Sequence, residues 1–259
     1  MISIVLPYYN RRQLLINTLH SISRSVIKDI EVIVVDDDSV EKERIEDLPN
    51  QFPFVRVIRV ESKDKWYVCC CMPMNRGIAE AKGDIIVLQN PECYHVQDVL
   101  AYITDRIKDQ NFLSISTYAY NQVQEKNLES MLANFKSLPQ QRFLSDLGWY
   151  NHPVYRPVYY HFCAALTRKN MELLGGFDER YAMGIARDDV EFIDRVDRLG
   201  LHKEIPTEVS VMHQWHSKVE SFHESRYPIR IEKNKVIYEL LTRKEDSVWK
   251  ENSYAKLTK

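Results

Sequence analysis

The chain has 259 residues, with 35 basic and 37 acidic side chains and a formal net charge of −2. This near balance argues against a surface that binds nucleic acid or another polyanion. Hydrophobic residues make up 44% of the chain, enough to build a sizeable core in one large domain or two small ones.

Apolar strand-like runs alternate with helix-like segments along most of the chain. In chain order the expected elements are strand 2–6, helix 11–25, strand 30–35, helix 40–48, strand 55–60, helix 75–84, strand 85–89, helix 96–108, strand 112–119, strand 159–167, helix 168–174, helix 188–199, strand 209–213 and helix 225–241. The β-α-β-α-β series at the start predicts a parallel, right-handed, doubly wound sheet.

Proline, asparagine and glycine give the expected boundaries. Pro7 should end the first strand, Asn10 should cap the first helix, and Gly83 should close the helix over 75–84. Residues 121–157 lack a regular pattern and are expected as a loop-rich region over the sheet edge, where substrate-specific parts often lie. The polar tail, 243–259, is expected to fray.

Three aspartates, Asp36, Asp37 and Asp38, follow the apolar run IEVIVV. Ligands of open α/β sheets bind outside the carboxyl ends of the strands, so this cluster is a candidate nucleotide site. A carboxylate there could accept a hydrogen bond from the imide of uracil or from a ribose hydroxyl. Helix capping by Asp38 or Ser39 would explain one residue only. A phosphoacceptor pocket of the receiver-domain kind would place its acidic pair after the first strand instead.

Two further sets follow later strands. Directly after the strand 85–89 come Asn90, Pro91 and Glu92, where a carboxylate could hold a divalent cation. A turn that leads into a helix is the alternative explanation of these three residues. His213 and His216 lie three residues apart after the strand 209–213. Together with an upstream carboxylate they make a plausible three-ligand metal set, whereas a single histidine would more often be structural.

A second acidic pair, Asp188 and Asp189, stands at the start of the helix 188–199. Negative charge is favoured at a helix N-terminus, so a good helix start is one explanation. A carboxylate at this place could also accept the proton of an attacking hydroxyl group.

The order of these motifs resembles the inverting family 2 glycosyltransferases, which have the GT-A fold. The matching stretches are SIVLPYYNR, IEVIVVDDDS, NRGIAEAKGDIIVLQNPE, GGFDERYAMGIARDDVEFIDRV and VMHQWH, between residue 2 and about 216. The resemblance implies an α/β, Rossmann-like, three-layer α/β/α fold with a mostly parallel central sheet. It implies a transferase domain over 1–224, with a nucleotide-sugar half to about 120 and an acceptor half over 121–224. A C-terminal helix and tail would occupy 225–259.

The resemblance also implies a donor site. The residues expected around the nucleotide in the first loop are Pro7, Tyr8, Tyr9, Asn10 and Arg11. Asp37 is expected to contact the base, with Asp36 next, while Asp38 stands where relatives often have Gly or Asn. Asn75 and Gly77 match an N-x-G that lines the diphosphate side, with Gly77 allowing close backbone approach.

The family's usual Asp-x-Asp metal motif corresponds here to Asn90, Pro91 and Glu92, so the first carboxylate is lost and the second is lengthened. An Asn-Pro-Asp form occurs among related enzymes. Asn90 then belongs to the nucleotide-sugar site, and Glu92, His213 and His216 would hold Mn²⁺ or Mg²⁺. The family's Glu-Asp pair corresponds to Asp188 and Asp189, with Asp189 as the base and Asp188 contacting the acceptor.

The function implied is a metal-dependent inverting glycosyltransferase of the hexosyl or N-acetylhexosaminyl type. It would move a sugar from a UDP-sugar to a hydroxyl of a glycan or polysaccharide. The alternatives are a non-catalytic nucleotide-sugar-binding or scaffold module and a nucleotidyltransferase, for which PYYNRRQ is a poor phosphate loop. Oligomeric state is left open.

Location and redox state follow from other features. No run of about 18 apolar residues exists, so no transmembrane segment is expected. The N-terminus is apolar with its charges after it, the reverse of a secretory signal. Five cysteines, three adjacent at 69–71, give neither a disulfide framework nor metal-finger spacing. We expect free thiols and a cytoplasmic protein, or one peripheral to the membrane through a partner.

Overall fold

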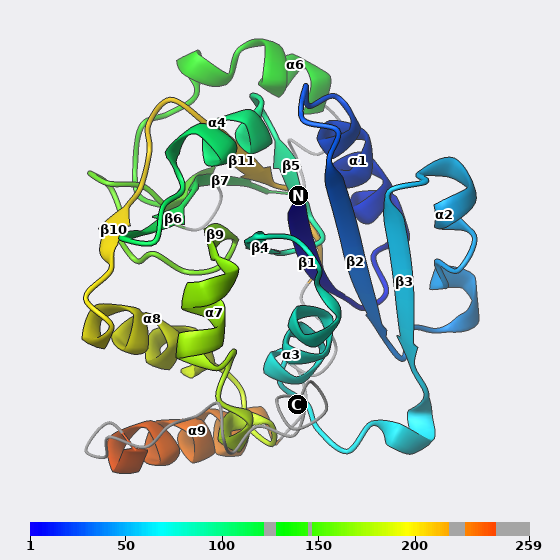
Figure 1. The fold of residues 1–259 in the computed structure, drawn as a ribbon, viewed down its shortest axis with the longest axis vertical. Helices are drawn as coiled ribbons and strands as arrows, with labels where there is room; N and C mark the ends of the chain where they lie inside the picture. The colour runs from blue at the N-terminus through cyan, green and yellow to red at the C-terminus, as the bar shows by residue number, and fades with distance from the viewer. Residues whose placement is uncertain (122–127, 145–146, 218–225, 242–259) are drawn as a thin grey trace.

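The computed structural model describes residues 1–121, 128–144, 147–217 and 226–241 of the chain (Figure 1). Its elements in chain order are β1 (Ile2–Tyr8), α1 (Arg12–Ser23), β2 (Ile30–Asp37), α2 (Leu48–Gln51), β3 (Val55–Val60), α3 (Cys71–Glu80), β4 (Ile85–Gln89), β5 (Cys93–His95), α4 (Val99–Arg106), β6 (Asn111–Ser114), β7 (Ser116–Tyr120), α6 (Leu128–Ala133), β8 (Leu147–Asn151), β9 (Cys163–Thr167), α7 (Arg168–Leu174), α8 (Asp188–Arg198), β10 (His202–Glu204), β11 (Ser210–His213) and α9 (Tyr227–Leu241). The tail, expected to fray, lies outside the described residues.

The central sheet has seven strands in the order β10-β6-β9-β4-β1-β2-β3. The pairs β1–β2, β2–β3, β1–β4 and β10–β6 are parallel, and β9 runs antiparallel between β4 and β6. The expected mostly parallel α/β architecture is therefore confirmed.

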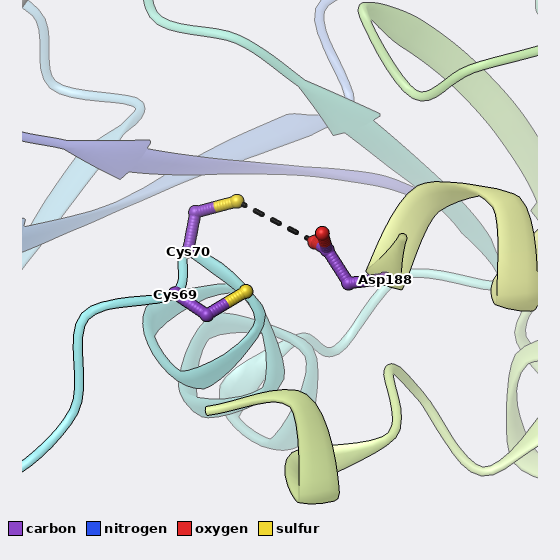
Figure 2. Close-up of side chains that lie close together, drawn as sticks. All are labelled: Cys69, Cys70 and Asp188. Carbon is purple, nitrogen blue, oxygen red and sulfur yellow. Dashed lines mark hydrogen bonds between the residues drawn. The ribbon is translucent and has the colours of Figure 1, made fainter. Parts of the chain in front are cut away.

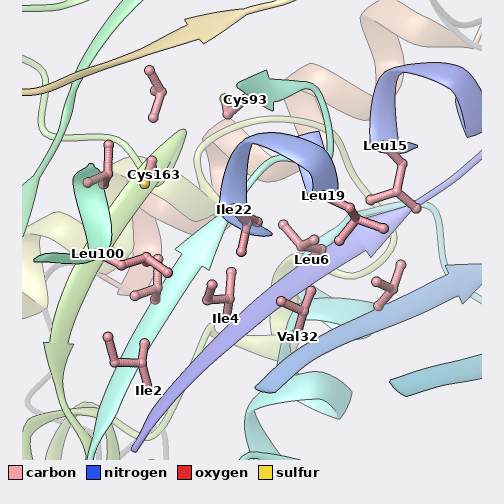
Figure 3. Packing of buried hydrophobic residues seen from close by; sticks show 14 of the residues in the cluster. Ile2, Ile4, Leu6, Leu15, Leu19, Ile22, Val32, Cys93, Leu100 and Cys163 are labelled. Atoms are coloured by element: carbon pink, nitrogen blue, oxygen red, sulfur yellow. The ribbon is translucent and has the colours of Figure 1, made fainter. Parts of the chain in front are cut away.

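Both faces of this sheet are buried, because successive residues of a strand point to opposite sides. Ile4, Leu6 and Val32 pack in the layer with α1 and α4, as Figure 3 shows. Val5 and Ile33 pack on the other face with residues of α3, α7 and α8. The helices thus cover the sheet from both sides, which explains why β1 and β2 read as continuous apolar runs.

A smaller sheet, in the order β5-β11-β7-β8, adjoins the first. The segment expected as one strand at 112–119 is in fact two: β6 belongs to the large sheet and β7 to the small one. The chain changes sheets at Ile115, whose N–H donates to the carbonyl of Cys163 at 2.8 Å. Residues 112–120 are all buried, so the apolar pattern carries no sign of the break. Part of the region expected as loop, 121–157, also forms α6 and β8.

Several expected boundaries are wrong for local reasons. β1 continues through Pro7, which pairs with β2 alone because the β4 partner ends opposite Val5. The segment 40–48 has only a 3₁₀ turn, Glu41–Glu43, ahead of α2. The helix expected at 75–84 begins at Cys71 and ends at Glu80. Gly83 instead packs against β1, where a Cβ would lie 2.6 Å from the Ser3 nitrogen.

The C-terminal helix α9 packs on the segment that precedes α8 (Figure 1). Asn234 donates its side-chain amide to the carbonyl of Ala186 at 2.8 Å. The five cysteines are free thiols, as expected. Among the described residues no helix is long and apolar enough to cross a membrane.

Candidate active site

Three of the expected site loops leave the same edge of the central sheet. The parallel register pairs Tyr8 of β1 with Asp36 of β2, and Val5 of β1 with Leu88 of β4. The loop after β1, the aspartates after β2 and the turn after β4 therefore emerge side by side. This is the edge at which open α/β sheets bind ligands.

Asp36 is turned into the protein and has no exposed surface. Its Oδ2 accepts a hydrogen bond from Arg59 at 2.6 Å, and its Oδ1 accepts one from the Ser39 N–H at 2.9 Å. Both oxygens hold the loop in place, and a contact of Asp36 with a nucleotide stays a prediction. Sequence reasoning missed Arg59, which lies in β3 and meets Asp36 only in the folded sheet.

Asp37 is the aspartate that faces the edge. Its Oδ1 accepts from the Tyr67 hydroxyl at 2.8 Å, and its Oδ2 lies 3.0 Å from Lys65 Nζ. Lys65 also lies over the ring of Tyr9, which is exposed. Asp38 has a φ of +67°, a left-handed conformation that Gly and Asn adopt most readily. Asp37 and Tyr9 both face this edge, and their contact with a base or ribose stays a prediction.

The loop after β1 is braced by its own polar groups. The buried Tyr8 donates its hydroxyl to the Glu43 carbonyl at 2.6 Å, and the hydroxyl accepts from the Arg11 N–H at 3.2 Å. Asn10 has a φ of +52°, and its Oδ1 accepts from the Val40 N–H at 2.9 Å. Asn10 therefore does not cap α1, which has no side-chain cap. Tyr8 and Asn10 shape the loop, and Tyr9 and Arg11 project from it.

Asn75 and Gly77 lie inside α3 and are buried. The Asn75 amide donates to the Phe177 carbonyl at 2.8 Å and its oxygen accepts from the Phe177 N–H at 2.7 Å. A Cβ on Gly77 would clash with the side chain of Val5. These contacts give Asn75 a bracing role and Gly77 a helix–sheet packing role. A contact of either residue with the diphosphate stays a prediction.

Glu92, His213 and His216 come together, as their residue types suggested. Glu92 Oε1 lies 3.1 Å from His213 Nε2 and 3.4 Å from His216 Nε2. Burial opposes the charge of Glu92, but Arg11 and the two histidines outweigh it and hold the pKa of Glu92 well below its usual range. Glu92 Oε2 is buried and has no hydrogen-bond partner. A buried carboxylate oxygen left unpaired is costly, and a cation is the natural partner for it.

Asn90 and Gln214 hold in place the two segments that carry this cluster. Asn90 begins a tight turn, since its carbonyl accepts from the Cys93 N–H at 3.1 Å. Gln214 is fully buried between the two histidines in sequence. Its side-chain nitrogen donates to the carbonyls of Glu92 and Leu14 at 3.1 and 3.0 Å. Gln214 thus fixes the strand end of β11 against the turn after β4. Only its position within H-Q-W-H could have signalled this role.

Asp188 and Asp189 begin α8, as expected. Burial and the neighbouring charge of Asp188 raise the pKa of Asp189 to about 6. Asp189 Oδ1 accepts a hydrogen bond from the Val190 N–H at 2.8 Å. A carboxylate with a raised pKa that remains partly exposed is suited to accept a proton near neutral pH.

The backbone before α8 is unusual, since Ala186 and Arg187 have φ values of +63° and +73°. Non-glycine residues adopt this conformation only where surrounding structure enforces it. Here α9 supplies the restraint through Asn234 on Ala186 and through the carbonyl of Arg230, which accepts from the Ile185 N–H at 3.2 Å. The C-terminal helix therefore helps to aim Asp189, a role that the sequence analysis did not foresee.

Aromatic residues of β8 and of the segment between β8 and β9 connect the two carboxylate sites. Tyr150 stacks on Phe162 with ring centroids 5.4 Å apart, and both rings pack edge-on against His213. Tyr160 packs at 6.3 Å from Phe162, and the charge of Asp189 contributes to the raised pKa of the Tyr160 hydroxyl. Desolvation is the larger cause of that rise. The sequence analysis did not predict these contacts.

The parallel sheet with helices on both faces, and carboxylates at its carboxyl edge and at the start of α8, define a sugar-transferase type of α/β protein. The family model described as Glycosyl transferase family 2 matches residues 3–174. The chain belongs to this family.

Curated relatives cover only parts of the chain. The dolichol-phosphate mannosyltransferase of Pyrococcus furiosus is 29% identical over 119 residues, which are 45% of this chain and 32% of that protein. The chondroitin synthase of Escherichia coli is 38% identical over 89 residues, 34% of this chain and 12% of that protein. The chain spans about a third or less of the length of these two relatives.

Solved structures resemble the whole fold. A mannosyltransferase from Pyrobaculum calidifontis, in complex with GDP-Man and Mn²⁺, has a TM-score of 0.58 at 17% identity, covering 98% of this chain and 68% of that one. TarS of S. aureus, in complex with UDP-GlcNAc, has a TM-score of 0.54 at 16% identity, covering 84% and 61%. These likenesses show that the fold is the GT-A fold.

Proposed function

We propose that the chain is a metal-dependent inverting glycosyltransferase that uses a UDP-sugar and a glycan or polysaccharide hydroxyl. The observation that carries this proposal is Glu92. Its Oε2 is buried without a partner beside two imidazoles, at the sheet edge to which Asp37 and Tyr9 also project.

The residues of this cluster fit a divalent cation. One ligand atom each from Glu92, His213 and His216 lies within 4.8 Å of the others. Carboxylate oxygen suits Mn²⁺ and Mg²⁺, and imidazole nitrogen is a common ligand of divalent transition metals. When bound, the cation would neutralise the charge of the departing nucleoside diphosphate.

Asp189 is the proposed base. Its carboxylate accepts the proton of the acceptor hydroxyl, whose oxygen attacks the anomeric carbon opposite the leaving group. Asp188 contacts the acceptor. A single displacement with one base and without a protein nucleophile inverts the anomeric configuration. The half-buried rings of Tyr150, Tyr160 and Phe162 lie on the acceptor side and offer apolar faces to a sugar.

The donor is proposed from the exposed groups near Asp37. Asp37 offers acceptor oxygens to a uracil imide or a ribose hydroxyl, and Tyr9 offers a ring face for stacking. The similar structures contain both UDP-GlcNAc and GDP-Man. Whether the sugar is a hexose or an N-acetylhexosamine, and which acceptor receives it, belongs to the same proposal and to the test below.

A non-catalytic nucleotide-sugar-binding module is the second candidate, and one observation favours it. Arg11 Nη1 already pairs with Glu92 Oε1 at 3.1 Å, which neutralises the carboxylate without a metal. Such a module would bind a nucleotide sugar but would neither hydrolyse nor transfer it.

A thermal-shift screen of UDP- and GDP-sugars, each with and without Mn²⁺, tests the proposal. A ligand that binds the native state raises the unfolding midpoint, and we expect the largest rise with one UDP-sugar plus Mn²⁺. Hydrolysis of that UDP-sugar without acceptor would separate an enzyme from a binding module. No midpoint change with any nucleotide sugar would overturn the proposal.

A further inference from the structure

A second group of metal-ligand types lies outside the cluster around Glu92. Cys69 and Cys70 stand at the start of α3, and Asp188 stands at the start of α8 (Figure 2). One ligand atom from each residue lies within 4.8 Å of the other two. Sequence spacing gave no hint of this group, because adjacent cysteines do not have metal-finger spacing and Asp188 is more than a hundred residues away.

The spacing of one pair of ligand atoms matches tetrahedral coordination. Zinc binds thiolate sulfur at about 2.3 Å and carboxylate oxygen at about 2.1 Å, so two such ligands stand about 3.6 Å apart across a tetrahedral angle. Cys70 Sγ lies 3.7 Å from Asp188 Oδ2, and Figure 2 shows the two side chains directed at each other. We propose that Cys69, Cys70 and Asp188 form a site for a thiophilic divalent cation such as Zn²⁺.

Access and charge both favour this site. Asp188 and Cys69 are each only 5% exposed, whereas Cys70 is exposed and opens the cluster to solvent. Binding forms two metal–sulfur bonds and sends the two thiol protons to the solvent. Two positive charges arrive and two protons leave, so the net charge of the cluster is unchanged and no additional net charge is buried.

The fourth position of the tetrahedron is open to a water, because Cys70 is exposed. Soft thiolates select thiophilic cations such as Zn²⁺ and Cd²⁺, whereas the cluster of Glu92, His213 and His216 offers no sulfur ligand. The two clusters therefore differ in the kind of cation that each prefers.

A cation here would have one consequence for catalysis, and this consequence rests on the proposed function. Asp188 would become a metal ligand beside the proposed base Asp189, and it would no longer be free to contact an acceptor. Zn²⁺ at this site should therefore stop transfer even while Mn²⁺ occupies the donor side.

Cd²⁺ titration with a non-thiol reductant tests the binding, because thiolate–Cd²⁺ bonds give an ultraviolet charge-transfer band that nitrogen and oxygen ligands do not. We expect saturation at one equivalent in the wild type, a loss of at least half of the band in Cys69→Ser and Cys70→Ser, and an unchanged band in Cys163→Ala. Cys163 is the control, since it is a buried free thiol that lies outside the group. Asp188→Asn should keep a band but weaken binding by more than about tenfold.

Absence of a band in the wild type, or an undiminished band in Cys70→Ser, would overturn the site. Zn²⁺ should also inhibit transfer by the wild type in saturating Mn²⁺, and Cys70→Ser should resist this inhibition. A one-equivalent band in a protein that transfers no sugar would support the site while overturning the proposed function, so the two failures are distinguishable.

Discussion

Arg11 donates its Nη1 to Glu92 Oε1 over 3.1 Å, across 81 residues of sequence. Arg11 lies in the loop after β1, and Glu92 follows β4. This pair therefore links the ends of two neighbouring strands at the carboxyl edge of the sheet. The Glu92 side chain is only 3% exposed, and its other oxygen has no partner. An arginine and the proposed cation therefore act on the same carboxylate.

Replacing Arg11 by alanine should lower the stability of the metal-free protein and increase the stabilisation that metal binding gives. We expect a loss of about 2–3 kcal/mol in the free energy of unfolding without metal, because a buried carboxylate loses a charged partner. Mn²⁺ should then raise the unfolding midpoint more than in the wild type. Arg12→Ala is the control, since its pair with Asp47 is exposed and should cost about 1 kcal/mol or less. An equal or smaller Mn²⁺ effect in Arg11→Ala would contradict competition for Glu92.

Removal of metal should abolish transfer and weaken UDP binding. After EDTA treatment we expect activity to return on addition of Mn²⁺ in the wild type. In Glu92→Gln it should not return, because the amide offers the cation no charge. Transfer assays and UDP calorimetry measure both effects. Activity and UDP affinity that survive EDTA unchanged would refute the role given to Glu92 and the histidines.

Asp189→Asn should lower the transfer rate by about 100- to 10,000-fold, the usual contribution of a general base, while UDP affinity stays close to that of the wild type. The same variant should be more stable at pH 8. A pKa raised from 3.8 to about 6 means that folding disfavours the carboxylate by up to about 3 kcal/mol. This cost is absent below about pH 4 and complete above about pH 6. Urea unfolding should therefore show a gain at pH 8 that shrinks as pH falls. Full activity in the variant would rule out Asp189 as the base.

The pH profile of transfer should report the same carboxylate. Because Asp189 must be ionised to accept a proton, kcat/KM should fall about tenfold for each pH unit below a pKa of about 6 and level off above it. Asp188→Asn removes the neighbouring negative charge and should move this midpoint to lower pH. A profile that is flat between pH 5 and 7 would mean that another group takes the proton.

The Gly77→Ala variant tests whether Gly77 serves helix–sheet packing alone or also contacts the diphosphate. The new methyl group meets the side chain of Val5, so we expect a loss of about 1–3 kcal/mol from overpacking. Adding Val5→Ala makes room for this methyl group, and the two substitutions should cost less together than the sum of their separate effects. UDP affinity should recover in the double variant if Gly77 serves packing alone. If UDP affinity stays low although stability recovers, Gly77 contacts the donor.

The features predicted correctly from the sequence were those with local signals. The strands that precede Asp37 and Glu92 are apolar runs with a polar end. The helix α8 is predicted by the acidic residues at its start, Asp188 and Asp189. The features that were missed depend on distant partners. Asp36 looks the same as Asp37 until Arg59 is brought beside it from β3. Asn10 has the chemistry of a cap, but its amide oxygen is taken by Val40.

The division of 112–119 between two sheets could not be predicted either, for a different reason. Both halves are buried, so the hydrophobic pattern is continuous across Ile115. Only the partners of the two strands, β9 for one and β11 for the other, distinguish them. The aromatic contacts of Tyr150, Tyr160 and Phe162 likewise arise from the arrangement of these sheets.

The antiparallel direction of β9 has a consequence for how this fold can diversify. Because β9 enters the sheet where its neighbour β4 leaves it, the Phe162 carbonyl bonds the Asn90 N–H at 3.0 Å. The chain that arrives at β9 therefore borders the same opening as the chain that departs from β4. Residues can be added or exchanged between β8 and β9 while the order of the central strands is kept. Sequence changes in this segment can thus alter the proposed acceptor side while the strands that carry the proposed donor residues stay in place.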